Sequence, residues 1–149
     1  MESNSNGSMA SYTTPNAIQV LLVEDNPECA ALICAQVGTG KDNLFHVEWK
    51  DTLQKAMARL AKPDIDVILL DLGMPELSGH ETHLAITSVV GKKVPVVILT
   101  SDTSMLSRNL TIGQGAASYL LKGRTSSLEL RLALQEAVAE SKRLKAVSL

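Results

Sequence analysis

The sequence lacks several features that would place it in a specialised class of protein. Its 149 residues carry no excess of one charge, since 14 basic and 16 acidic residues leave a net charge of −2. A nucleic-acid surface normally shows a basic excess, so direct binding of nucleic acid is not expected. No run is long and apolar enough to span a bilayer, so membrane insertion is not expected either. The composition, 45% hydrophobic and 20% charged, is that of one globular domain.

Cysteine is equally scarce. Cys29 and Cys34 are the only two, and their spacing in a predicted helix puts them on different faces and matches no common metal motif. We interpret them as small residues in or near the core, in a reducing compartment. The polar start, MESNSNGSMASYTTPN, has neither the basic nor the apolar stretch of a signal peptide. We therefore expect residues 1–16 to be a disordered lead-in and the location to be cytoplasmic.

Five short runs rich in β-forming residues predict five strands. They are IQVLLV (18–23), LFHVEW (44–49), DVILLD (66–71), VPVVIL (94–99) and ASYLL (117–121). Three of them are continuously apolar, as expected of strands covered on both faces of a parallel sheet. LFHVEW instead alternates, which indicates a half-exposed edge strand.

Helical patterns fill the gaps between these strands. Residues 51–61 repeat apolar side chains on one helix face, with Asp51 as the expected N-cap. Asn26-Pro27 is a start signal for the first helix, and Gly91 a stop signal for the third. Two capping boxes predict further helix starts, at Ser78-x-x-Glu81 and Ser126-x-x-Glu129.

The alternation of strand and helix, repeated five times, predicts the fold class. It is typical of an α/β protein in which a doubly wound parallel sheet has helices on both faces and right-handed crossovers. We expect five strands in the order 2-1-3-4-5, a flavodoxin-like arrangement. The predicted domain covers residues 17–145, with a last helix from about 127 to 145 and a tail at 146–149.

Polar residues that could carry chemistry follow the predicted strands, always at the same end. They are Glu24, Asp25, Asp71, Thr100, Asp102 and Lys122. Ligands of doubly wound sheets bind at the carboxyl ends of the strands, where the winding direction reverses. Three carboxylates gathered there would repel one another unless a cation joined them, and Mg²⁺ prefers such oxygen ligands.

The same set of residues suits phosphoryl transfer. Lys122 supplies a fixed positive charge and Thr100 a hydroxyl, both of which can stabilise a phosphoryl group. No histidine or cysteine lies at these strand ends, so the expected nucleophile is the central carboxylate, Asp71, which would form an aspartyl phosphate.

The remaining polar and aromatic residues receive no catalytic assignment. His46, His80 and His83 form no ligand set, and we expect them on the surface. Trp49 is interpreted as packing on the edge strand.

Four segments together resemble the receiver domain of two-component response regulators. They are LLVEDNP, VILLDLGMPELSG, VVILTSD and SYLLKG, in family order and spacing, and the resemblance covers about residues 17 to 145. It implies a (βα)5 receiver fold in which Asp71 accepts the phosphoryl group, while Glu24 and Asp25 hold Mg²⁺, for which Mn²⁺ or Ca²⁺ could substitute. It also implies that the backbone carbonyl of Gly73 ligates the metal.

The resemblance further implies a phosphorylation switch. Thr100 and Lys122 match the residues that contact phosphoryl oxygens, and Tyr119 matches the aromatic residue that turns inward when the threonine moves. Two departures stand out. Gly123 follows Lys122 where the family usually has a cis proline, and glycine does not favour a cis bond, which leaves the state of this bond open. Gly73 has no side chain where many receivers carry a polar one that tunes phosphoryl lifetime, which leaves Asp102 as the expected tuner.

The function implied by the resemblance is a signalling module rather than an enzyme, although it would assist its own phosphorylation and dephosphorylation. A histidine kinase or histidine phosphotransfer protein would donate the phosphoryl group. The surface of the fourth helix, fifth strand and last helix would then act on a downstream partner or an attached output domain, with homodimerisation through the same surface left open.

Three other classes are weighed against this one. A phosphatase of the haloacid-dehalogenase type needs a second aspartate two residues after the nucleophile, where this chain has Gly73. A flavodoxin-like cofactor binder needs a phosphate loop after the first strand, where this chain has the acidic EDNPE. A phosphorylation-independent interaction domain usually loses part of the acid, threonine and lysine set, which is complete here.

Overall fold

The computed structural model describes residues 17–38 and 43–147, so the expected lead-in of residues 1–16 lies outside the described part. The strands are β1 (Ile18–Val23), β2 (Phe45–Lys50), β3 (Val67–Leu70), β4 (Val96–Thr100) and β5 (Ser118–Leu121). The helices are α1 (Pro27–Val37), α2 (Leu53–Arg59), α3 (Gly79–Val90), α4 (Met105–Gly113) and α5 (Ser127–Val147). Every predicted strand is present, with its ends shifted by at most two residues.

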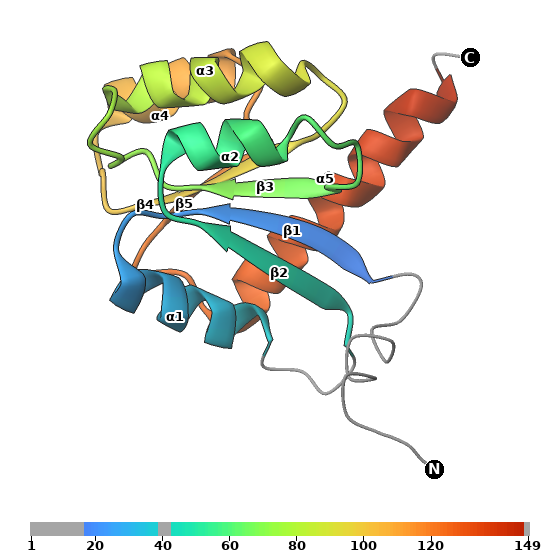
Figure 1. Cartoon of the computed structure of the whole chain (residues 1–149), viewed down its shortest axis with the longest axis horizontal. Coiled ribbons are helices and arrows are strands. Elements are labelled where there is room, and N and C mark those ends of the chain that lie inside the picture. The colour runs from blue at the N-terminus through green and yellow to red at the C-terminus, as the bar shows by residue number, and fades with distance from the viewer. Residues whose placement is uncertain (1–16, 39–42, 148–149) are drawn as a thin grey trace.

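The strands form one parallel sheet in the order β2-β1-β3-β4-β5, which confirms the predicted topology. β1 pairs with β2 on one side and β3 on the other, so that Leu22 lies between Trp49 and Leu69. The carboxyl ends of the strands lie on the left in Figure 1. The winding direction reverses between β1 and β3, and a crevice is expected where these two strands end.

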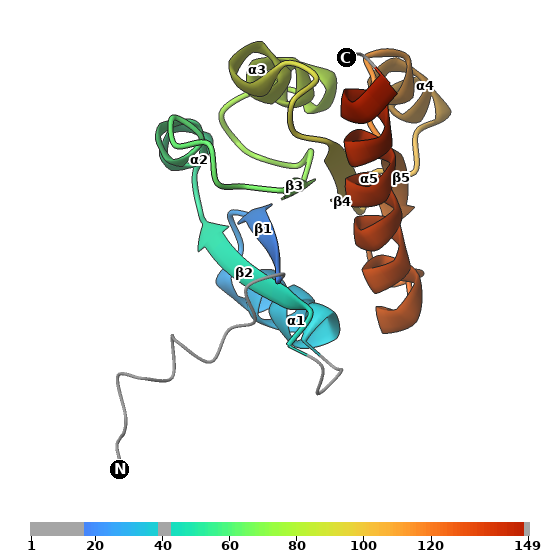
Figure 2. The ribbon, with the colours of Figure 1, turned by 90° about the vertical axis from the view of Figure 1, so that its right-hand side faces the viewer.

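Helices cover both faces of the sheet. α1 and α5 lie on one face, and α2, α3 and α4 lie on the other (Figure 1 and Figure 2). Alternate side chains of β1 divide the core between the two layers: Val20 and Leu22 pack toward α1 and α5, and Leu21 and Val23 toward α2 and α3. β3 and β4 are wholly buried, as their continuous apolar runs predict, and β2 is the expected half-exposed edge.

Helix starts follow local capping chemistry, with one correction to the sequence prediction. The Asn26 side chain accepts hydrogen bonds from two backbone amides of the first turn of α1, and Pro27 occupies its first position. Asp51 is not the N-cap of α2. The Thr52 hydroxyl accepts the capping bond from the Lys55 amide, while the Asp51 carboxylate pairs with the Lys55 ammonium at 3.0 Å. Either side chain is a good cap by type, so only the backbone path decides between them.

The two predicted capping boxes are both present. The Ser78 amide donates to the Glu81 carboxylate at 3.3 Å, and the Ser126 amide donates to the Glu129 carboxylate at 2.9 Å. Gly91 ends α3 as predicted, with a φ of 60° that favours glycine over any residue with a side chain. α5 continues to Val147, two residues beyond the expected end.

His83 is not on the surface, contrary to the sequence prediction. It is fully buried where α3 meets the end of α4, and its Nδ1 atom lies 2.9 Å from Oε1 of Gln114. Its Nε2 atom is buried without a hydrogen-bond partner. Burial lowers the pKa of His83 below its ordinary value, and the Gln114 bond offsets this only in part. The sequence did contain a signal, because His83, Ile86 and Val90 share the buried face of α3.

The final turns of α5 project beyond the amino ends of the strands (Figure 1). From residue 139 onward the described side chains are exposed, apart from the half-buried Ser141, which agrees with the charged pattern of this segment. None of the helices in the described ranges is long and apolar enough to cross a membrane.

Candidate functional site

The predicted site residues come from four strand ends, and the sheet order brings them to one edge. Asp71 directly follows β3, and its backbone amide donates to the carbonyl of Val23 at the end of β1 at 3.0 Å. Glu24 directly follows β1, and Lys122 directly follows β5. The Lys122 amide in turn donates to the carbonyl of Thr100 at the end of β4 at 2.8 Å. These hydrogen bonds between neighbouring strands therefore hold the backbone of Asp71 beside the end of β1 and that of Lys122 beside the end of β4.

Both oxygens of the Asp71 carboxylate have a donor. Oδ1 accepts a hydrogen bond from the Gly73 amide at 2.9 Å, and Oδ2 accepts one from the Lys122 ammonium at 3.1 Å. Asp71 is 6% exposed, so this carboxylate is nearly buried yet still borders solvent. A carboxylate held in this way is oriented before any reaction begins, which reduces the entropy lost in the transition state.

Glu24 is the most deeply buried acid of the site, at 1% exposure. One of its carboxylate oxygens, Oε2, accepts a hydrogen bond from the Asn26 amide at 3.1 Å. The other, Oε1, lies 2.6 Å from the Lys122 ammonium. Lys122 thus bridges the two buried acids, Glu24 and Asp71.

Burial and the neighbouring charges shift the pKa values of Glu24 and Lys122. Burial raises the pKa of the Glu24 carboxyl, and the bonds from Lys122 and Asn26 offset this only in part. For Lys122, burial opposes the charge, but the adjacent Glu24 and Asp71 carboxylates outweigh it, so its pKa lies above the ordinary value. Lys122 therefore stays charged throughout the physiological range.

A polar connection through Asp102 links two of the expected switch residues, Thr100 and Tyr119. The Asp102 amide lies 3.3 Å from Oγ1 of Thr100, to which it donates, and the Tyr119 hydroxyl donates to the Asp102 carbonyl at 2.8 Å. Thr100 is buried and Tyr119 half-buried. The Asp102 carboxylate accepts a bond from the Ser104 amide at 2.8 Å, so it caps the segment leading into α4.

The donor set suits a hard divalent cation. One carboxylate oxygen each from Glu24, Asp25 and Asp71 lies within 4.8 Å of the others, and Asp25 is exposed to solvent. Mg²⁺ favours carboxylate oxygens and keeps several water ligands, which the exposed position of Asp25 permits. In the described part of the chain, the buried oxygen Glu24 Oε1 is paired with the Lys122 ammonium alone, which leaves a lone pair that a cation can use. The residues present therefore fit the metal that the sequence implies.

Sequence reasoning missed one residue that supports this cluster. Trp49, interpreted as edge-strand packing, donates its Nε1 hydrogen to the backbone carbonyl of Glu24 at 2.7 Å. Trp49 is 39% exposed, and its indole combines an apolar ring that packs on the edge strand with this hydrogen-bonding group. Only the parallel register of β1 and β2, which extends to Val23 opposite Lys50, brings the two residues together.

Comparison with known proteins agrees with the fold. Residues 20–135 match the response regulator receiver domain family, which is most of the chain. The class defined by the fold and by this match is a signalling domain controlled by phosphorylation. The chain belongs to the response regulator receiver domain family.

Relatives of this chain differ in how much of their length it covers. It is 32% identical over 108 residues to the two-component response regulator ORR5 of Oryza sativa subsp. japonica, covering 71% of this chain and 78% of that protein. It is 30% identical over 107 residues to the signal transduction histidine-protein kinase BarA of Escherichia coli strain K12. That match covers 71% of this chain but only 11% of BarA.

Solved structures repeat the same architecture. The chemotaxis response regulator CheY4 of Vibrio cholerae superposes with a TM-score of 0.67 at 27% identity, covering 81% of this chain and 98% of that one. A CheY-like receiver domain protein of Methanospirillum hungatei JF-1 gives a TM-score of 0.73 at 16% identity, covering 85% and 98%. The second likeness, at this low identity, concerns the fold alone.

Proposed function

We propose that Asp71 is the phosphoacceptor of this receiver domain. In the reaction, a carboxylate oxygen of Asp71 attacks the phosphorus of a phosphohistidine, and an O–P bond forms as the P–N bond breaks. The imidazole nitrogen leaves with the bonding electrons and takes a proton from solvent. The observation that carries the proposal is the pair of bonds to Asp71, from Gly73 and Lys122, which orient a nearly buried carboxylate at the switch point of the sheet.

The other residues of the site have separate roles in this proposal. Lys122, already beside Oδ2 of Asp71, binds a phosphoryl oxygen after transfer. Thr100 offers its hydroxyl from the neighbouring strand, and its link through Asp102 to Tyr119 carries the change toward α4 and β5. Phosphorylation thereby favours one of two arrangements of this surface.

Glu24, Asp25 and Asp71, with the backbone carbonyl of Gly73, are the residues that would hold Mg²⁺. When bound, the ion neutralises charge on the phosphoryl oxygens. Glu24 contributes through its buried carboxylate, which accepts a hydrogen bond from the Asn26 amide, while the Trp49 indole holds the Glu24 backbone carbonyl. In this proposal the domain promotes its own phosphorylation and dephosphorylation but turns over no separate substrate.

The phosphoryl donor in this proposal is a histidine kinase or a histidine phosphotransfer protein. The surface of α4, β5 and α5 would contact a downstream partner, an attached output domain or a second copy of the chain. Supporting this, α4 exposes Met105 and Leu106, at 63% and 70%. A cytoplasmic location is part of the proposal, and two free cysteines are consistent with it.

We further propose Gly73, rather than Asp102, as the main determinant of phosphoryl lifetime. A Cβ atom at Gly73 would lie 3.4 Å from Oδ1 of Asp71, so any side chain there would begin at the reacting carboxylate. The Asp102 carboxylate is instead engaged by the Ser104 amide. Replacing Gly73 with Asn should change the dephosphorylation rate more than Asp102→Asn does. The reverse order, measured by loss of phosphoprotein over time, would contradict this assignment.

The experiment that tests the phosphoacceptor is incubation with acetyl phosphate and Mg²⁺, followed by intact-mass measurement. We expect the native chain to gain one phosphoryl group and Asp71→Asn to gain none. Asp64→Asn is a matched control, because Asp64 is an exposed surface acid paired with Arg59. Equal labelling of the native chain and Asp71→Asn would refute the proposal.

The metal assignment is tested separately. Glu24→Gln combined with Asp25→Asn should remove both the labelling and its dependence on Mg²⁺. If this double variant folds, by circular dichroism, and is labelled at the native rate, these two residues do not hold the metal.

A further inference from the structure

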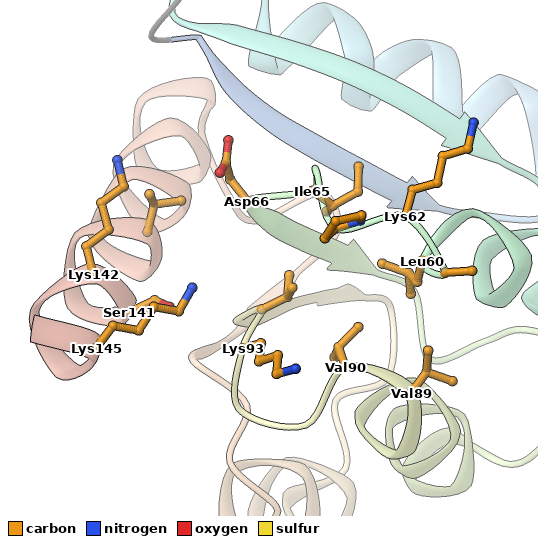
Figure 3. Close-up of a pocket in the computed structure, with 14 residues that line it drawn as sticks. Leu60, Lys62, Ile65, Asp66, Val89, Val90, Lys93, Ser141, Lys142 and Lys145 are labelled. Carbon is orange, nitrogen blue, oxygen red and sulfur yellow. The ribbon is translucent and has the colours of Figure 1, made fainter. Parts of the chain in front are cut away.

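A concave site lies at the amino ends of the strands, the opposite end of the sheet from the acidic cluster. It has a volume of about 560 Å³. Its walls are the segment between α2 and β3, the turn between α3 and β4, and the final turns of α5 (Figure 3). We call it the lysine groove. Its size falls in the range of small-molecule sites, roughly 300–1,000 Å³.

The floor of the lysine groove is apolar. It is formed by Leu60, Ile65, Val90 and Val138, all of which are buried core residues, with the half-buried Val94 beside them. An apolar floor favours the hydrocarbon or ring portion of a ligand, since contact there removes apolar surface from water. A simple inorganic anion would leave this floor unused.

The rim of the groove is strongly basic. Four lysines from the three walls surround the floor: Lys62, Lys93, Lys142 and Lys145. In Figure 3, Lys142 and Lys145 lie on α5, Lys93 in the turn between α3 and β4, and Lys62 in the segment between α2 and β3. Asp66 is the only acid among the described residues that line the groove, and its carboxylate already accepts a hydrogen bond from the Gln19 amide at 2.8 Å. The rim therefore attracts a ligand that carries several negative charges.

One wall of the groove lies outside the part of the chain that matches the receiver family. That match ends at residue 135, whereas Val138, Ser141, Lys142 and Lys145 belong to the final turns of α5. The groove is therefore built partly by the α5 extension of this chain, and not by the matched domain alone.

We propose that the lysine groove binds a ligand of the nucleotide class, which carries two or more phosphate groups and a flat heterocyclic ring with an apolar face. The ring would lie on the apolar floor, and the phosphates would pair with lysines of the rim in charge-assisted contacts. Phosphates that reach both Lys93 and Lys142 join the α5 extension to the turn between α3 and β4. A docked protein partner would instead need about 800 Å² of contact surface per side, which a concavity of this size does not offer.

The test is titration of the full chain with ADP and with GDP, without Mg²⁺, followed by two-dimensional ¹H–¹⁵N NMR. We expect saturable binding of at least one of them with a Kd below about 1 mM. The shifted amides should be those of the groove, such as Val94 and Ser141, and the same shifts should occur in Asp71→Asn. No saturation by either nucleotide, or shifts centred on Asp71, would overturn the proposal.

Two further probes separate the phosphates from the ring. Pyrophosphate and adenosine should each bind more weakly than ADP, because each lacks one of the two contacts. Pyrophosphate that binds as tightly as ADP would refute the role of the apolar floor. An acidic peptide of ten glutamates that binds more tightly than both nucleotides would show a peptide-docking surface instead, and would also overturn the proposal.

Matched variants locate the site. Lys93→Gln and Lys142→Gln should each weaken ADP or GDP binding about threefold to fivefold, the range of an exposed ion pair. Lys92→Gln makes the same charge change one residue away but does not line the groove, so it should have no effect. Ser141→Glu should abolish binding, whereas Ala139→Glu, on the exposed side of α5, should not. If Lys93→Gln and Lys92→Gln had equal effects on binding, or Ser141→Glu and Ala139→Glu did, the ligand would not bind in the lysine groove.

Discussion

Replacing Lys122 with Met tests whether two buried acids depend on one ammonium group. That ammonium lies 2.6 Å from Oε1 of Glu24 and 3.1 Å from Oδ2 of Asp71. The two carboxylate side chains are 1% and 8% exposed, so neither is well hydrated once the lysine is lost. Methionine keeps most of the length of the side chain and its packing, which confines the change to the charge.

The expected loss of stability follows from this burial. Removing one partner of a fully buried ion pair costs about 3–5 kcal/mol. The Lys122 side chain is 20% exposed, and protonation of Glu24 limits the penalty, so without metal we expect a loss of about 2–3 kcal/mol. Saturating Mg²⁺ should restore most of this loss, because the ion supplies the missing positive charge between the acids.

Urea unfolding followed by circular dichroism, with EDTA or with Mg²⁺, measures both effects. Lys55→Met is the matched control, since Lys55 pairs with Asp51 on the surface and its loss should cost less than about 0.5 kcal/mol. If Lys122→Met and the native chain have the same urea midpoint of unfolding in EDTA, the stability of the two acids does not depend on this lysine. If Mg²⁺ stabilises the native chain and the variant equally, the cation does not replace the ammonium.

Three other predictions follow from particular contacts. The pKa of His83 in the folded state is lowered from 6.5, so the folded state binds a proton on His83 less readily than the unfolded state does. The stability that this difference contributes is present above pH 6.5 and is lost as the pH falls through the folded-state pKa. Between pH 7.5 and 5.5 the unfolding free energy of the native chain should fall more steeply than that of His83→Gln, by up to about 1.4 kcal/mol per pH unit, and equal slopes would contradict this. Leu69→Ala, at a fully buried position, should cost about 2–5 kcal/mol in urea unfolding, whereas Leu32→Ala, at a 67% exposed one, should stay within about 0.5 kcal/mol. Trp49→Phe removes the donor to the Glu24 carbonyl and should weaken Mg²⁺ binding about threefold to tenfold by calorimetry, and an unchanged affinity would show that this bond does not position the acid.

Much of the fold could be predicted because its signals are local. The apolar runs, the capping boxes and the Asn26-Pro27 start each act within a few residues, so they can be recognised without knowing their neighbours in space. The strand order also followed, since five strand–helix repeats leave few topologies that keep right-handed crossovers. A prediction that depended on how helices pack against one another was wrong. His83 was expected on the surface, although it faces the end of α4.

The candidate site shows the same division. Asp71 and Lys122 could be singled out because an acid and a lysine directly follow apolar strands. Their separation of 3.1 Å, and the bond from the Gly73 amide to Asp71, depend on the paths of loops that no local pattern describes. The bond from Trp49 to Glu24 had no sequence signal, because it joins residues on two different strands.

The sequence by itself determined which residues end the strands, and therefore that Glu24, Asp71, Thr100 and Lys122 share one edge of the sheet. Side-chain alternation and helix capping are properties of the chain over short distances, which is why they suffice for this. The tertiary structure alone decided that Lys122 bridges both buried acids and that α5 forms one wall of the lysine groove. Those contacts join segments far apart in sequence, and their geometry is set by how the two helical layers pack on the sheet.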